Sequence, residues 1–136
     1  MKSFCVATLS LFSFISAELT HFERGLNLYD QRAEKSIGLN ADPSLIGEAI
    51  NEFLIAMKSP EKELDAGVFL LKCYYFKGKF VSQNDDEKKD IYSKGKVLGE
   101  KLINLYPESV SAHYWYLVNL GSGQKSMVQC QQLEKV

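Results

Sequence analysis

The residues that could do chemistry are few in this chain of 136 residues, and they lie far apart. Neither of the two histidines, His21 and His113, has a cysteine or carboxylate cluster at the spacing that zinc ligands share. Cys73 could act as a nucleophile beside His113 only if its thiol were exposed and had a lowered pKa. The neighbours of Cys73 are apolar, which favours a buried core position instead. We therefore expect no metal site and no cysteine nucleophile.

The clustered carboxylates and glycines also lack the spacing of known ligand loops. Residues 85–87 are acidic and stand before two lysines, which is typical of a solvated loop and a helix start. An EF-hand loop requires a central glycine and a terminal glutamate at fixed positions, and this segment meets neither requirement. The glycines of segment 121–123 lack the lysine and the preceding strand of a phosphate-binding loop. The sequence predicts no enzyme and no cofactor, and a hydrolase is only a third alternative.

Charge and cysteine content exclude further classes of function. The 16 basic and 17 acidic residues are interspersed, so no basic stripe favours nucleic acid and no polybasic block favours anionic lipid. After residue 17 only Cys73 and Cys130 remain, and two cysteines are too few for a disulfide framework. Whether these two cysteines pair stays open.

The N-terminal residues predict export. Lys2 precedes an apolar run over residues 4–15, and the small residue Ala17 ends it. This layout is typical of a secretory signal peptide, and the run is shorter than the roughly 20 apolar residues that span a bilayer. The alternative is a buried first helix, which the absence of a 3.6-residue periodicity disfavours. We expect a signal peptide over residues 1–17, a mature chain 18–136 without a membrane span, and a periplasmic or secreted location.

Apolar periodicity and turn residues predict an all-α domain. No segment shows the sustained alternation with Asn-Gly or Asp-Gly turns that is typical of β-hairpins. Asp42 before Pro43, and Ser59 before Pro60, are good starts for new helices. The expected helices cover residues 18–36, 43–58, 60–77, 85–105 and 109–120, with a sixth over 124–136. Short connections imply antiparallel neighbours, so helical hairpins are expected at about 18–58, 60–105 and 109–136.

Two features of the apolar pattern predict how these helices pack. The helix expected over 60–77 is apolar on more than one face, so it should lie centrally between neighbours. Gly95 and Gly99 stand four residues apart on one face of the helix over 85–105. Since each glycine weakens a helix interior by about 1 kcal/mol relative to alanine, the pair predicts a close helix crossing.

The helical pattern resembles that of tetratricopeptide (TPR) repeats. Ala49, Phe53 and Ala56 have the small–aromatic–small spacing of the second helix of such a unit, and Pro60 follows them. The segment 105–121 combines a helix end, a proline, a capping serine and an aromatic-rich new helix. Units of about 34 residues are typical of this family. The resemblance implies stacked antiparallel hairpins, which form a short TPR-like α-solenoid that is incomplete at its C-terminus.

More narrowly, segments 28–34, 73–76 and 112–121 are similar to the T-component proteins of tripartite TRAP transporters. This resemblance implies a non-enzymatic accessory component of periplasmic solute uptake, with a periplasmic solute-binding protein as its partner. The alternative is a generic secreted TPR adaptor that binds peptides or proteins. Assembly into a homo-oligomer stays open, and no nucleic-acid partner is expected.

Stacked hairpins present a shared face built from their first helices, which here are the third and fifth helices. On them, Lys72, Tyr75, Tyr114 and Asn119 are the expected partner-binding residues. Tyrosine rings offer apolar area together with a hydroxyl group, and the lysine would attract a carboxylate. The alternative is that the aromatic rings fill the core between the hairpins.

Overall fold

The computed structural model describes residues 18–133, and it describes the side chains of residues 18–125. The expected signal peptide over residues 1–17 lies outside the described residues and stays a prediction. The structure has five helices: α1 (His21–Asp30), α2 (Pro43–Ala56), α3 (Glu63–Phe80), α4 (Asp85–Leu105) and α5 (Val110–Leu133). Within residues 18–133 there is no strand beyond an isolated bridge between Ile37 and Asn40. The expected all-α class is therefore confirmed for this part of the chain.

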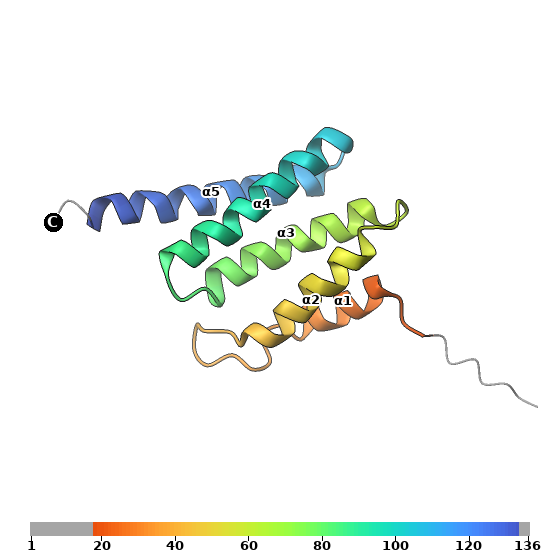
Figure 1. The fold of residues 1–136 in the computed structure, drawn as a ribbon, viewed down its shortest axis with the longest axis horizontal. Helices are drawn as coiled ribbons and strands as arrows, with labels where there is room; N and C mark the ends of the chain where they lie inside the picture. Colours follow the sequence, from red (N-terminus) through yellow and green to blue (C-terminus); the bar gives the residue numbers. More distant parts are fainter. Residues whose placement is uncertain (1–17, 134–136) are drawn as a thin grey trace, which may run out of the picture.

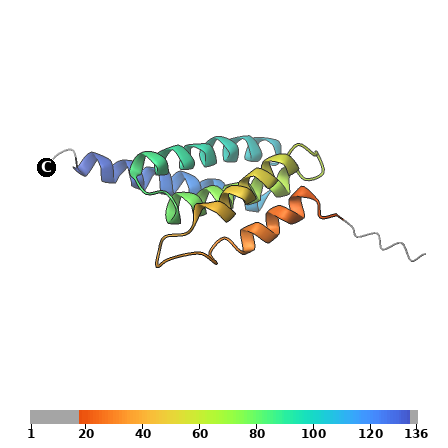
Figure 2. The same cartoon turned by 60° about the horizontal axis from the view of Figure 1, so that its bottom comes forward.

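Each helix packs on the next one in the sequence, and α3 also packs on α5. Figure 1 shows the resulting order across the molecule, with α1 and α2 at one edge, α3 in the middle, and α4 and α5 at the other edge. The view in Figure 2 places α1 and α4 on opposite sides of the molecule. The C-terminal part of α5 extends past its neighbours in both views. None of the helices within residues 18–133 has the length and apolarity needed to cross a membrane.

Local capping explains where α2 and α4 begin. The carboxylate of Asp42 accepts a hydrogen bond from the Ser44 N–H (2.8 Å), and Pro43 is the first helical residue, as the sequence predicts. At α4 the side chain of Asn84 accepts from the Glu87 N–H (2.9 Å). Each bond satisfies one of the N–H groups that a helix start leaves without an intrahelical partner.

The first helix is shorter than the sequence predicts. It ends at Asp30 because residues 31–35 form turns instead of a further helical turn. A tight turn follows, in which Ile37 and Asn40 exchange two backbone hydrogen bonds of 2.8 and 3.1 Å. Gly38 at its tip has a φ of 61°, a conformation that glycine adopts without steric cost.

The third helix is displaced towards the C-terminus relative to its expected range. It starts at Glu63 rather than at residue 60, because the Lys62 N–H donates to the Ser59 carbonyl (3.0 Å) and closes a separate turn. It continues through Gly78 to Phe80. As expected, α3 is buried on more than one face and contributes to two apolar clusters.

The structure corrects the prediction of a sixth helix and of a third hairpin over 109–136. α5 runs without a break through Gly121 and Gly123 to Leu133. The Ser122 hydroxyl donates to the Val118 carbonyl one turn earlier (2.7 Å), which is compatible with continuous helix. A glycine weakens the helix by only about 1 kcal/mol, and the packing of α5 against α4 outweighs that cost. α5 therefore pairs with α4 and α3 and not with a helix of its own.

The predicted close crossing at Gly95 and Gly99 is confirmed, and it joins α4 to α5. A Cβ atom added at Gly99 would lie 2.5 Å from Cδ2 and 2.8 Å from Cβ of Tyr116. A Cβ atom at Gly95 would lie 2.6 Å from Cγ of Asn119. Real Cβ atoms do not come so close to other heavy atoms, so only glycine allows the two helices to approach to this distance.

We predict that Gly99→Ala lowers the free energy of unfolding by about 1–3 kcal/mol, because the added methyl group overlaps the Tyr116 side chain. The matched control is Gly121→Ala on α5, where no atom lies within 4 Å of an added Cβ. That change should raise the free energy of unfolding by up to about 1 kcal/mol through helix propensity. Denaturant unfolding of both variants measures the two effects. Stabilisation by Gly99→Ala would refute the close crossing, and destabilisation by Gly121→Ala would refute the continuous α5.

Candidate functional site

Three of the four residues singled out in the sequence lie together on α3 and α5, around the ring of Trp115. The ring centroid of Trp115 is 5.9 Å from that of Tyr75 and 5.3 Å from that of Tyr114, which it meets edge-on. The Lys72 ammonium lies 4.0 Å from the Phe69 ring centroid and 5.8 Å from that of Trp115. We call these five residues, Phe69, Lys72, Tyr75, Tyr114 and Trp115, the aromatic–lysine face.

This face combines exposed apolar area with a positive charge. Tyr114 is 59 % exposed, and the other four residues are partly buried. Lys72 forms no ion pair with any residue whose side chain is described, so the aromatic rings are its partners. A ring attracts a cation without neutralising it. The ammonium therefore remains able to bind a carboxylate, while the neighbouring rings can cover an apolar group beside that carboxylate.

Asn119 differs from the expectation, because its side chain is completely buried and not part of this face. Its Nδ2 group donates to the carbonyl of Leu71 on α3 (3.0 Å) and to that of Trp115 on α5 (2.8 Å). Its Oδ1 has no hydrogen-bond partner among the described residues and faces Gly95 of α4. Asn119 thus connects three helices, and in this structure it cannot touch a partner at the surface.

A pocket between α3, α4 and α5 has no counterpart in the sequence reasoning. It measures about 290 Å³ and contains lysines from all three helices: Lys79, Lys88 and Lys125. We call it the lysine pocket. Tyr75, which also belongs to the aromatic–lysine face, lines it together with Tyr92. The lysines are far apart in the sequence and form no motif, so nothing in the sequence pattern groups them.

Tyr92 has a defined position in this region. Its ring is buried, and a Cβ atom added at Gly78 of α3 would lie 2.6 Å from its Cζ. Burial raises the pKa of the Tyr92 phenol above its ordinary value, the nearby Tyr75 adds to the increase, and a hydrogen bond with Ser122 opposes it. The Tyr92 hydroxyl is therefore protonated at neutral pH.

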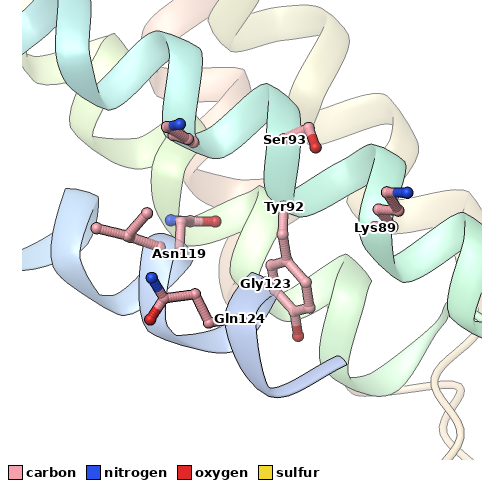
Figure 3. A pocket seen from close by; sticks show the side chains of 8 residues that line it. Lys89, Tyr92, Ser93, Asn119, Gly123 and Gln124 are labelled. Carbon is pink, nitrogen blue, oxygen red and sulfur yellow. The ribbon is translucent and has the colours of Figure 1, made fainter. Parts of the chain in front are cut away.

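Tyr92 also lines a second cleft, of about 160 Å³, between α4 and α5. Figure 3 shows Lys89 and Ser93 along α4, and the Tyr92 ring extending from α4 towards Gly123 of α5. Gln124 of α5 lies beside that ring in the same view. Tyr92 therefore lines both this cleft and the lysine pocket.

The two histidines weighed in the sequence have other partners in the structure, and the cysteine is buried. Cys73 is buried and free, and burial raises the pKa of its thiol to about 12, so it is not a thiolate at neutral pH. The His113 Nε2 atom lies 2.8 Å from the carbonyl of Pro107, and His21 Nδ1 lies 2.7 Å from the Glu52 carboxylate. Over the described residues, no group of three or more histidines, cysteines and carboxylates could hold a metal ion.

Comparison of the chain with protein-family models, with curated proteins and with solved structures finds no match.

We predict that Asn119→Ala lowers the free energy of unfolding by about 1–3 kcal/mol, because it removes two buried hydrogen bonds and leaves a small cavity. Asn104→Ala, at an exposed position of α4, is the matched control and should change stability by less than about 0.5 kcal/mol. Urea unfolding followed by circular dichroism compares the two. Equal effects of both substitutions would show that the amide of Asn119 does not hold α5 against α3.

Proposed function

We propose that this protein is an exported, non-enzymatic binding protein built from TPR-like hairpins, and that its aromatic–lysine face binds a segment of a partner protein or peptide. The observation that carries the proposal is the grouping of Lys72, Tyr75 and Tyr114 around Trp115. Residues from two helices supply an exposed ring, further aromatic area and a cation without an acidic partner among the described residues. Exposed aromatic anchors of this kind dominate the energy of many protein interfaces.

The order of helix contacts supports the TPR-like part of the proposal. α1 packs on α2 and α3 on α4, which are the pairs that form two hairpins. The packing of α3 on α5 is what a solenoid requires of the first helices in successive units. In this arrangement α3 and α5 would share the face that stacked repeats use for binding.

The chemistry of the face favours a ligand with a carboxylate next to an apolar group. Lys72 would pair with the carboxylate, and the rings of Trp115 and Tyr114 would cover the apolar part. The C-terminus of a peptide that ends in a large apolar residue has both features. An acidic side chain within a folded partner surface would serve in the same way.

The sequence resemblance supports a more specific form of the proposal, an accessory role in periplasmic solute uptake beside a solute-binding protein. The signal-peptide layout of residues 1–17 is compatible with that compartment. The alternative is a secreted adaptor that binds peptides in general. A protein of the uptake type should bind one folded partner, whereas an adaptor should bind a range of unfolded peptides.

We predict that Tyr114→Ala and Lys72→Ala each weaken peptide binding about tenfold, which corresponds to the loss of one aromatic or charged anchor. The ligands are peptides with an apolar C-terminal residue and a free carboxylate, titrated by calorimetry, and their C-terminal amides should bind more weakly than the acids. Val97→Ala on α4 is the control, because Val97 is similarly exposed and lies outside the face.

All three variants should keep the unfolding midpoint of the unchanged protein, since the changed side chains are exposed or partly exposed. Equal affinities of the folded variants would exclude this face as the binding surface. Equal binding of acids and amides would exclude the role of Lys72.

We predict that the exported protein begins at Glu18, because the short apolar run and the small residue Ala17 are typical of a cleavage site. Mass spectrometry of the protein recovered outside the cytoplasm measures the N-terminus. Recovery of the exported chain with Met1 still present would contradict the cleavage, and retention inside the cell would contradict the export.

A further inference from the structure

We propose that the lysine pocket is an oxyanion site that binds a small phosphate-bearing molecule, either inorganic phosphate or a phosphate monoester. The site does not depend on the function proposed for the aromatic–lysine face, although Tyr75 belongs to both. The proposal follows from the charge of the pocket, from its hydrogen-bond donors and from the way in which Tyr92 is held.

The charges that line the pocket are positive. Lys79 comes from α3, Lys88 from α4 and Lys125 from α5, and no carboxylate is among the lining residues. Lys88 lies 3.6 Å from the nearby Asp85, so one of the three charges has an acidic partner. Lys79 and Lys125 have no ion pair within the part of the chain whose side chains are described. Among the side chains that the structure describes, two positive charges in one recess therefore have no acidic partner, and they would attract an anion.

Two further acids near this end of α4, Asp90 and Glu87, face other groups. The Asp90 carboxylate lies 2.7 Å from the Lys94 ammonium. The Glu87 carboxylate accepts hydrogen bonds from the backbone N–H of Gln83 (2.8 Å) and from the side-chain amide of Asn84 (3.0 Å). These acids are therefore engaged in capping and pairing along α4, and they do not neutralise the pocket.

The Tyr75 hydroxyl completes the set of donors. The Tyr75 hydroxyl accepts a hydrogen bond from the Lys79 ammonium (3.0 Å), so its own proton is available to a ligand. The Tyr92 phenol is already engaged in a hydrogen bond with Ser122, whose own proton goes to the Val118 carbonyl, so Tyr92 gives the pocket its shape and not a free donor. Ammonium and hydroxyl donors that converge on one recess match the several acceptor oxygens of a phosphate group.

The packing around Tyr92 gives the pocket a defined floor. The Tyr92 ring lies so close to the backbone of Gly78 that a side chain at that position would collide with it. On the other side, a Cβ atom at Gly123 would lie 3.3 Å from Cβ of Tyr92. Because the end of the ring is at Gly78, the phenol lies beside the α3 residues that line the pocket. A recess of about 290 Å³ is large enough for a phosphate group with a small organic substituent.

The direct test is calorimetric titration of the protein with inorganic phosphate and with glycerol 3-phosphate at low ionic strength. The double variant Lys79→Gln with Lys125→Gln should bind both about tenfold more weakly or worse, because it loses two charge-assisted hydrogen bonds. The control is Lys35→Gln with Lys58→Gln, which changes the net charge equally at exposed positions outside the pocket. Equal affinities of the two double variants would show that only the overall charge attracts phosphate, and would overturn the site.

Tyr75→Phe provides a second measurement that keeps the ring in place and removes the hydroxyl whose proton is free. It should weaken phosphate binding severalfold, while the circular dichroism spectrum should remain that of the unchanged protein. Vesicles with and without phosphatidic acid distinguish the other source of a phosphate group, a lipid headgroup. Binding to the anionic vesicles without measurable binding of either soluble phosphate would overturn the proposal of a small ligand, and so would phosphate affinity that Tyr75→Phe leaves unchanged.

Discussion

The close approach of α4 to α5 is the contact on which the rest of the structure depends. It is possible because Gly95 and Gly99 present backbone rather than side chains to Asn119 and Tyr116. Asn119 of α5 lies against Gly95 of α4, and its amide donates to the Leu71 carbonyl of α3. A buried amide of this kind is favourable only where its partners stand at hydrogen-bond distance, so it defines one position of α5 along α3.

α3 contributes both to the core and to the two candidate binding regions. Cys73, Tyr74 and Phe76 are buried, whereas Lys72, Tyr75 and Lys79 point to the partly exposed side of the same helix. A helix that is apolar on several faces usually lies fully inside a protein, but here one stripe of α3 carries lysines and tyrosine hydroxyls. The stripe lies beside α5, whose Trp115 and Lys125 extend it. A rigid, centrally packed helix is a suitable support for such residues, because packing holds its backbone in place.

The two proposed sites have different chemistry, and they share Tyr75. On one side its ring meets Trp115 in the aromatic–lysine face. On the other side its hydroxyl accepts from Lys79 in the lysine pocket. The Lys79 ammonium has three donors, so it can keep this hydrogen bond while it binds an anion. Both proposed sites would depend on surface complementarity and charge, not on a reactive group.

Local signals in the sequence determined much of the fold. Asp42 and Pro43 predict the start of α2, because a capping side chain and a proline act within a single helical turn. Gly95 and Gly99 predict the close crossing, because two glycines on one face weaken a helix and are best explained where a neighbouring helix leaves no room for a side chain. Lys72, Tyr75 and Tyr114, three of the four expected surface residues, lie together around Trp115. The apolar periodicity that predicts α3 and α5 also predicts that these residues lie on neighbouring helices. Only the tertiary structure decided that α5 continues through Gly121 and Gly123, because packing on α4 outweighs a local cost of about 1 kcal/mol per glycine. It likewise decided that Asn119 is buried and that Lys79, Lys88 and Lys125 line one pocket. No local spacing places these side chains, because their positions depend on how α3, α4 and α5 pack against one another.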